Sequence, residues 1–362
     1  MSSSTLAFAL AILALAPPTA CQTPAASLAS FYSLTTSTAF PFPTATMSPD
    51  DAQDLLTSRW GLIKGRIQDG NDTLAFVDDP FPDQPAPGSS EDTSSTSAPV
   101  LRVTYPAGSF SHSTGGAQFI NLWNSTNAST AQFSDLDSSD IGFGSLLLEY
   151  EVAFDADFDW VQGGKLPGLR GGLDSTGCSG GSEPGVAAGD SCFSTRLMWR
   201  TEGAGEVYAY APETESLCEQ DDIICNDDYG VSMGRGRFGF QAGRWNRIAM
   251  LVQLNSPASA SNGNIELYYN GQPVVTQQNL RLRATSAVSA NGLFFSTFFG
   301  GSDESWATPN TTHTYFRNMR MWGSVEASNS TGSVNRASRN GGPDVLAVML
   351  AMGLAVAAAW VL

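Results

Sequence analysis

Residues 192–211 carry the sequence CFSTRLMWRTEGAGEVYAYA, in which a Gly-rich turn separates two strand-like runs. Successive side chains of a strand point to opposite faces, so the first run has one polar, cationic face and one largely apolar face. The polar face consists of Ser194, Arg196, Met198 and Arg200. The apolar face consists of Phe193, Thr195, Leu197 and Trp199. We expect the apolar face to pack between two sheets.

The second run, 206–211, places its two tyrosines on a single face. A hairpin loop at 201–205 would place Arg196 opposite Tyr210, with Cβ atoms about 5 Å apart. The same register places Met198 opposite Tyr208. A slip of one residue would move both tyrosines to the other face, so this geometry depends on the register.

Short runs of the same character recur from residue 100 onward, between clusters of Gly, Asn, Asp and Ser. The predicted strands are 100–105, 117–122, 144–154, 192–200, 206–211, 237–241, 245–254, 265–269, 292–299 and 315–322. Asn270-Gly271 is a strong signal for a two-residue hairpin turn. Helical periods do not separate the runs, which argues against a parallel α/β sheet. The sequence therefore predicts an all-β, two-sheet antiparallel β-sandwich in a single domain.

The part of the chain before residue 100 has a different composition. Residues 1–21 contain an apolar run of signal-peptide length followed by Pro and small residues, although no Lys or Arg precedes that run. Residues 22–99 are rich in Ser, Thr and Pro and are predicted to form a loose leader. Within it, Ser48 as cap and Pro49 in the first turn predict a short helix that ends near Arg59.

The other end of the chain suggests a membrane anchor. Residues 324–344 form a polar spacer, and 345–362 form an uncharged apolar tail. Small residues near Ser330 fit the attachment site of a glycolipid (GPI) anchor, with the tail removed. Retention of the tail as a transmembrane helix is the alternative. Five Asn-x-Ser/Thr sites indicate a secreted, cell-surface glycoprotein: Asn71, Asn124, Asn127, Asn310 and Asn329.

The net charge limits the class of ligand, and the cysteine count indicates disulfide bonds. The formal net charge of −17 disfavours nucleic acid. Eight of the eighteen Lys and Arg nevertheless lie between Lys165 and Arg247, where they could attract an acidic ligand. Removal of a signal peptide through Cys21 would leave four cysteines, which indicates two disulfides in an oxidising compartment. Neighbours in sequence suggest Cys178–Cys192 and Cys218–Cys225, with three connectivities open.

The cationic and phenolic side chains suit an acidic sugar. Arginine donates in a fixed fork that matches a carboxylate, and lysine adds a compact charge whose pKa responds to burial. A phenol beside cations can take and return a proton. This set matches β-elimination next to a uronate carboxylate without a metal ion. Solvated Arg–Tyr pairs without chemistry are the simpler alternative.

The two histidines, His112 and His313, lie far apart and form no metal-binding pattern.

Several motifs together resemble polysaccharide lyase family 14, a family of alginate and glucuronan lyases with a β-jelly-roll fold. They are GGKLPGL at 163–169, CSGG at 178–181, CFSTRLMWR at 192–200, GEVYAYAP at 205–212, YGVSMGRGRFGFQAGRWNRI at 229–248 and FSTFFGGSDESWA at 295–307. The similarity covers about residues 100–322. The resemblance implies the catalytic set Lys165, Ser194, Arg196, Tyr208 and Tyr210.

The resemblance also implies roles. Arg196 and Lys165 would neutralise the substrate carboxylate, Ser194 would orient it, and either Tyr208 or Tyr210 would move the protons. We further expect Arg200, Arg235 and Arg237 to line a substrate-binding groove, although pairing with the many acidic residues is the alternative. The expected protein is a monomer that takes an acidic polysaccharide and needs no cofactor or metal.

Two other functions stay open. A non-catalytic carbohydrate-binding wall protein could use the same face. A glycoside hydrolase would need a pair of carboxylates, but the Glu-x-Asp-x-x-Glu pattern of sandwich-fold glucanases is absent from the sequence.

Overall fold

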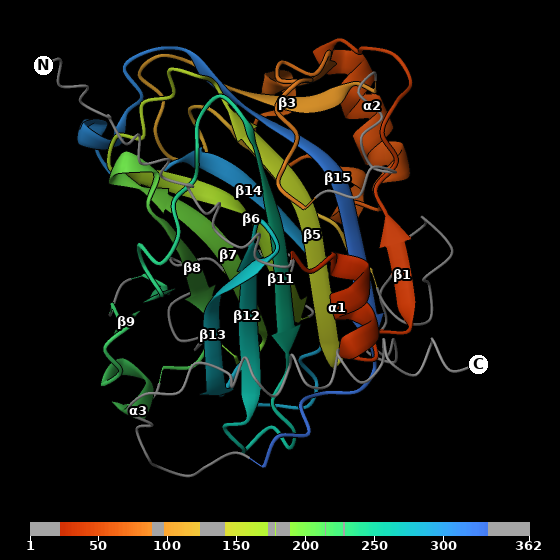
Figure 1. Cartoon of the computed structure of the whole chain (residues 1–362), viewed down its shortest axis with the longest axis vertical. Coiled ribbons are helices and arrows are strands. Elements are labelled where there is room, and N and C mark those ends of the chain that lie inside the picture. Colours follow the sequence, from red (N-terminus) through yellow and green to blue (C-terminus); the bar gives the residue numbers. More distant parts are fainter. Residues whose placement is uncertain are drawn as a thin grey trace, which may run out of the picture.

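The chain folds into two antiparallel β-sheets packed face to face (Figure 1). The computed structural model describes residues 22–88, 98–123, 142–172, 178, 189–213, 215–226 and 229–331. Within these residues the first sheet has eight strands in the order β13-β12-β11-β5-β15-β3-β2, with β1 paired to β15. The second has seven strands in the order β4-β14-β6-β7-β8-β10-β9. The predicted all-β sandwich is confirmed.

The strands of the first sheet are β1 (Thr36–Ala39), β2 (Leu74–Val77), β3 (Val100–Tyr105), β5 (Ser145–Phe154), β11 (Trp245–Gln253), β12 (Gly263–Tyr269), β13 (Gln272–Leu280) and β15 (Thr312–Ser324). Those of the second are β4 (Ala117–Ile120), β6 (Gly163–Gly172), β7 (Cys192–Arg200), β8 (Gly205–Tyr210), β9 (Ile223–Ile224), β10 (Val231–Met233) and β14 (Ala290–Phe299). The α-helices are α1 (Ala25–Phe31), α2 (Pro49–Arg59) and α3 (Glu215–Cys218). Short 3-10 turns are η1 (Ile63–Gly65), η2 (Asn71–Thr73), η4 (Thr201–Gly203) and η5 (Glu304–Trp306).

The main core lies between the sheets and is rich in aromatic residues. In β7, the side chains of Phe193, Leu197 and Trp199 enter this core, as the alternation predicts. The ring of Trp199 meets that of Phe299 from β14 at a centroid distance of 5.3 Å. Tyr105, from the other sheet, contacts Trp199 edge-on at 6.3 Å. These contacts fix the inner face of the second sheet, so its outer face is left for other side chains.

Nine of the ten predicted strands are present, with ends that differ by a few residues at most. The predicted strand at 237–241 is wrong, because Gly234 and Gly236 adopt positive φ and turn the chain before it. That segment makes only an isolated bridge between Ala204 and Gly239. The Asn270-Gly271 turn is confirmed, with φ of 52° and 77° at the two residues between β12 and β13.

The expected loose leader is instead part of the folded domain. Strand β1 pairs with β15, and β2 pairs with β3. Helix α1 packs against the outer face of the first sheet through Leu28 and Ala29, next to Leu251 of β11. These elements are short, at four residues for each strand and seven for α1, so no extended periodic pattern marks them in the sequence. Helix α2 was predicted correctly, with the Ser48 hydroxyl accepting a hydrogen bond from the Asp51 amide.

Some predictions lie outside the described residues: the signal peptide at 1–21, the glycosylation sites Asn124 and Asn127, and the apolar tail at 345–362. The described glycosylation sites, Asn71, Asn310 and Asn329, are exposed, as is Ser330. None of the helices in the described ranges is long and apolar enough to cross a membrane.

The docking of α1 gives a stability prediction. Leu28 is 5% exposed, whereas Phe31 on the same helix is 63% exposed. We expect Leu28→Ala to cost about 2 kcal/mol of unfolding free energy, because it leaves a cavity under the helix. For a domain of this size the cost lowers Tm by ~5 °C in a thermal melt. Phe31→Ala is the matched control and should leave Tm nearly unchanged. Equal Tm values for both variants would show that α1 does not stabilise the domain.

Candidate active site on the outer face of the second sheet

The hairpin of β7 and β8 has a register different from the predicted one, shifted by two residues. Arg196 lies opposite Tyr208, and Ser194 lies opposite Tyr210. The predicted pairs, Arg196 with Tyr210 and Met198 with Tyr208, are therefore wrong. The reason is a tighter loop: the Arg200 amide donates to the Ala204 carbonyl, and η4 alone makes the turn. A shift by two keeps every side chain on its face, so Arg196 and both tyrosines still share one side of the sheet.

Strand β6 brings Lys165 to the same face through an irregular segment that sequence inspection did not recognise as a strand. Lys165 pairs with Met198, but the register of β6 on β7 shifts between Leu166 and Leu169. Pro167 and Gly168 fill this bulge, one of the few places where a central strand accepts proline. A Cβ at Gly168 would lie 1.9 Å from the Thr195 carbonyl oxygen. The GGKLPGL motif thus lets the backbone of β6 approach β7 closely beside Arg196.

Arg196 is a buried cation with no carboxylate partner among the described residues. Its side chain is 2% exposed, and one terminal nitrogen donates to the Ser296 hydroxyl at 3.0 Å. The guanidinium lies 4.5 Å from the ring centre of Phe294 and 5.7 Å from that of Tyr210. Burial lowers the pKa of Arg196 to about 10, which still leaves it charged at neutral pH. Its buried Nε has no hydrogen-bond partner in the described residues.

Lys165 makes no ion pair with an acid among the described residues, although the charge of Glu206 partly offsets the factors that lower its pKa. Its amine donates to the Met198 thioether at 3.2 Å and lies 4.3 Å from the ring centre of Tyr208. Desolvation lowers the pKa of Lys165 well below the usual lysine value, and the charges of Arg196 and Arg200 lower it further. A lysine in this environment can exist as a neutral amine at lower pH than a solvated one.

The two tyrosines form an edge-to-face pair at 5.6 Å between ring centroids. Tyr208 is nearly buried, and its hydroxyl accepts a hydrogen bond from the Gly230 amide at 3.1 Å. Burial and the neighbouring Tyr210 raise the pKa of Tyr208 above the usual phenol value. Tyr208 therefore keeps its proton across the neutral range.

Ser194 is fully buried, and its hydroxyl donates to the Cys178 carbonyl at 2.7 Å. Both predicted disulfides, Cys178–Cys192 and Cys218–Cys225, are present. Ser194 and the first disulfide together tie Cys178 to the start of β7. In this arrangement Ser194 holds the chain beside the site.

The three arginines expected to line a substrate groove all contact acids of the protein. Arg200 and Arg235 both pair with the fully buried Glu206, at 2.5 Å and 2.6 Å. Arg237 pairs with Asp222. These contacts fix the arginines in place, and the pairing foreseen as the alternative is present for each.

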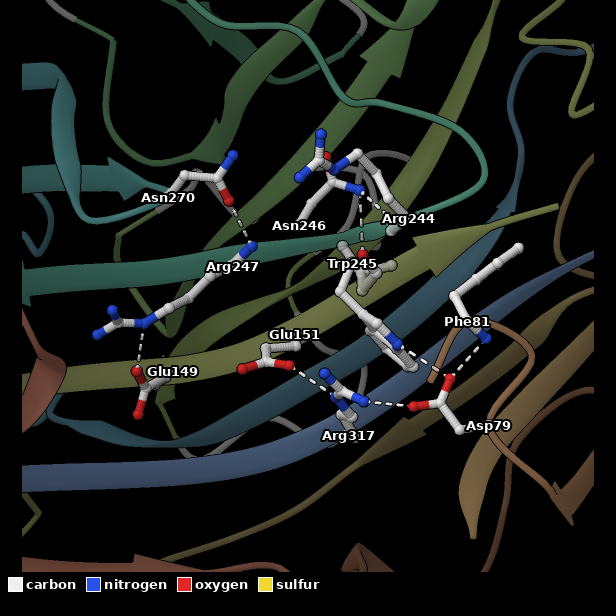
Figure 2. Close-up of polar contacts among 11 residues, drawn as sticks. Asp79, Phe81, Glu149, Glu151, Arg244, Trp245, Asn246, Arg247, Asn270 and Arg317 are labelled. Carbon is white, nitrogen blue, oxygen red and sulfur yellow. Dashed lines mark hydrogen bonds and ion pairs between the residues drawn. The ribbon is translucent and has the colours of Figure 1, made fainter. Parts of the chain in front are cut away.

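Two arginines on the outer face of the opposite sheet, Arg247 and Arg317, offer a contrast because acids of the protein pair with both (Figure 2). Arg247 donates to Glu149 at 2.8 Å. Arg317 donates to Glu151 at 2.7 Å, and it also pairs with Asp79. The guanidinium of Arg317 further lies over the Trp245 ring at 4.0 Å. Burial alone therefore does not explain why Arg196 has no acid beside it.

The sequence alone did not identify the residues on β14 and β4 that support the Arg196 side chain. Ser296 donates to Gln118 at 3.2 Å, and the Gln118 amide donates to Asp69 at 3.3 Å. Phe294 and Phe298 flank the two cations. Ser296 and Phe298 lie within the FSTFFGG motif, where alternation along a predicted strand places them on one face. No sequence signal linked Gln118 to them.

The two-sheet sandwich brings Lys165, Arg196, Tyr208 and Tyr210 together on one outer face. The chain belongs to polysaccharide lyase family 14, whose family model matches residues 93–319.

One solved structure supports this assignment, and two others share the fold. The marine family-14 alginate lyase from Aplysia kurodai is 35% identical over 70% of this chain and 88% of its own, with a TM-score of 0.55. Alginate lyase Aly36B shares the fold at 18% identity, over 81% of this chain and 99% of its own, with a TM-score of 0.56. A doubly substituted Aly36B, 16% identical over 81% of this chain and 99% of its own with a TM-score of 0.55, was solved with an alginate tetrasaccharide. No curated protein matches the chain.

The bulge in β6 gives a prediction for the site. Gly168→Ala places a methyl group against the backbone of Thr195 and Arg196, so β7 must move away from β6. We expect a loss of about 2 kcal/mol or more in stability, because strain of this kind cannot relax within a packed sheet. The lyase activity of Gly168→Ala should fall by a larger factor than the fraction of folded protein does. Gly239→Ala is the control, since only the Gly203 oxygen lies near its Cβ, at 3.8 Å. Wild-type Tm and activity in Gly168→Ala would contradict the role of the bulge.

Proposed function

We propose that this lyase cleaves a β-1,4-linked polyuronate, such as glucuronan or alginate, by β-elimination. The observation that carries the proposal is the buried guanidinium of Arg196, which has no carboxylate partner within the described residues and lies, with the Lys165 amine, beside two phenols. A uronate carboxylate supplies the missing negative charge. The alginate lyases named among the similar structures support a substrate of this class.

In the proposed reaction, Arg196 binds the substrate carboxylate and stabilises the negative charge that develops on it. Its hydrogen bond to Ser296 and the rings of Phe294 and Tyr210 hold the guanidinium before substrate arrives. Little reorganisation is then needed when charge develops, and a pre-organised donor of this kind is worth on the order of 10²–10³ in kcat.

Lys165 takes the C5 proton in this proposal, which differs from the neutralising role expected from the sequence. Its lowered pKa makes the neutral amine available as a base. The electrons of the C5–H bond form the C4–C5 double bond, and the C4–O4 bond breaks. Tyr208 gives its proton to O4, because its raised pKa keeps it protonated until that step. The proton on Lys165 then returns to the Tyr208 phenolate, which restores both groups.

The direct test is to incubate the purified protein with glucuronan and with alginate and to follow the ultraviolet absorbance of the unsaturated product. We expect product from at least one polymer, and we expect Tyr208→Phe to lower kcat by about 10²–10⁴-fold, since it removes the acid. Tyr32→Phe, directly after α1 at the far sheet, is the control. Binding of either polymer without product would support the carbohydrate-binding protein, and new reducing ends without the chromophore would support a hydrolase.

The role of Lys165 predicts a pH dependence. A base must be deprotonated, so kcat rises with pH through the lowered pKa of Lys165. Removing the positive charge of Arg200 raises that pKa, because Arg200 is one of the charges that lower it. Arg200→Gln should therefore shift the acid limb of the kcat profile to higher pH. If Lys165 instead acts as a cation, kcat falls as pH rises through its pKa, and the shift appears on the alkaline limb.

A further inference from the structure

Glu206 is a buried carboxylate on the same face as the proposed active site. It lies on β8, two residues before Tyr208 and directly opposite Met198. Its side chain is 0% exposed and accepts hydrogen bonds at both oxygens. The donors are Arg200 Nε at 2.9 Å and Arg200 Nη2 at 2.5 Å on Oε1, and Ser232 Oγ at 2.7 Å and Arg235 Nε at 2.6 Å on Oε2.

This cluster keeps a net positive charge, because one carboxylate is shared by two guanidinium groups. Arg200 uses two nitrogens on Glu206, so it is the closer partner. Arg235 uses only its Nε, which leaves both of its terminal nitrogens without a protein partner in the described part of the chain. Its side chain is 40% exposed, whereas that of Arg200 is 17% exposed. A ligand can therefore reach the unused nitrogens of Arg235.

The position of this charge relative to the reacting groups suggests what binds it. Two residues along a strand span about 7 Å, so Glu206 and its arginines lie next to Tyr208 and not at a remote surface. The Arg200 guanidinium is 5.9 Å from the Tyr208 ring centre. A polyuronate carries a carboxylate on every sugar. When one carboxylate is bound at Arg196, its neighbours along the chain need partners too.

We propose that Arg235, oriented by Glu206 and supported by Arg200, binds the carboxylate of a neighbouring uronate unit and forms a second charged subsite. This inference rests on the proposed polyuronate substrate. Glu206 is the positioning residue of the subsite, because it fixes the two arginines without cancelling their combined charge. The free edge of the Arg235 guanidinium offers the paired donors that a carboxylate accepts.

The test compares Arg235→Gln and Arg235→Lys with the wild type on polymer and on oligouronates of decreasing length. We expect Arg235→Gln to raise KM for the polymer about tenfold with little change in kcat, because the variant loses one charge-assisted contact with the substrate. The difference should shrink on the shortest oligomer that is cut, because that substrate cannot span both sites. Arg235→Lys should restore part of the affinity. Salt should weaken polymer binding more in the wild type than in Arg235→Gln.

Arg320→Gln is the control for net charge, because Arg320 is exposed on β15 of the other sheet. Equal KM values for Arg235→Gln and Arg320→Gln, or an equal loss on substrates of every length, would overturn the subsite. Affinity electrophoresis in polyuronate gels measures binding without turnover. Wild-type protein that binds the polymer but does not cut it contradicts the proposed chemistry, while weaker binding by Arg235→Gln in the same gel still supports the subsite.

Discussion

The structure depends on one unusual constraint: Arg196 is charged, buried and without a carboxylate partner in the described residues. Burying an unpaired ion costs several kcal/mol unless hydrogen bonds and other charges compensate. The compensation here is partial, through the Ser296 hydroxyl and the faces of Phe294 and Tyr210. In the proposed function, the carboxylate of the substrate completes this compensation. The same sandwich pairs Arg247 and Arg317 with its own acids, whereas Arg196 has no acid partner among the described residues.

The packing of β6 and β7 positions the Arg196 side chain. The aromatic core around Trp199 fixes the inner face of β7, so Arg196 has only the outer face available. The Pro167-Gly168 bulge lets β6 approach β7 at Arg196. Desolvation, together with the charges of Arg196 and Arg200, lowers the pKa of Lys165, and burial beside Tyr210 raises that of Tyr208. In the proposed reaction these opposite displacements let the Lys165 amine accept a proton and let the Tyr208 phenol donate one.

The sequence alone predicted the all-β class, the side chains that share each strand face and the family. It did not predict the pairing register of β7 and β8. Alternation along β7 and β8 identified which side chains share a face, and a shift by two residues left that prediction intact. The loop length decided the pairs, and η4 closes the turn in three residues where five were expected. Strand β6 was missed because Pro167 and its glycines resemble a loop. The contribution of Gln118 depends on a neighbour 178 residues away, Ser296, which no local pattern encodes.

We propose that the substrate supplies the carboxylate that Arg196 lacks. The most direct measurement is calorimetric titration of the inactive Lys165→Gln variant with a uronate oligosaccharide, alongside the same oligosaccharide with its carboxylates reduced to alcohols. We expect the acid form to bind and the reduced form to bind at least about tenfold more weakly, because the reduced form cannot make one buried charge-assisted contact. Equal affinity for the two forms would contradict it, because Arg196 would then remain without a counter-ion in the complex.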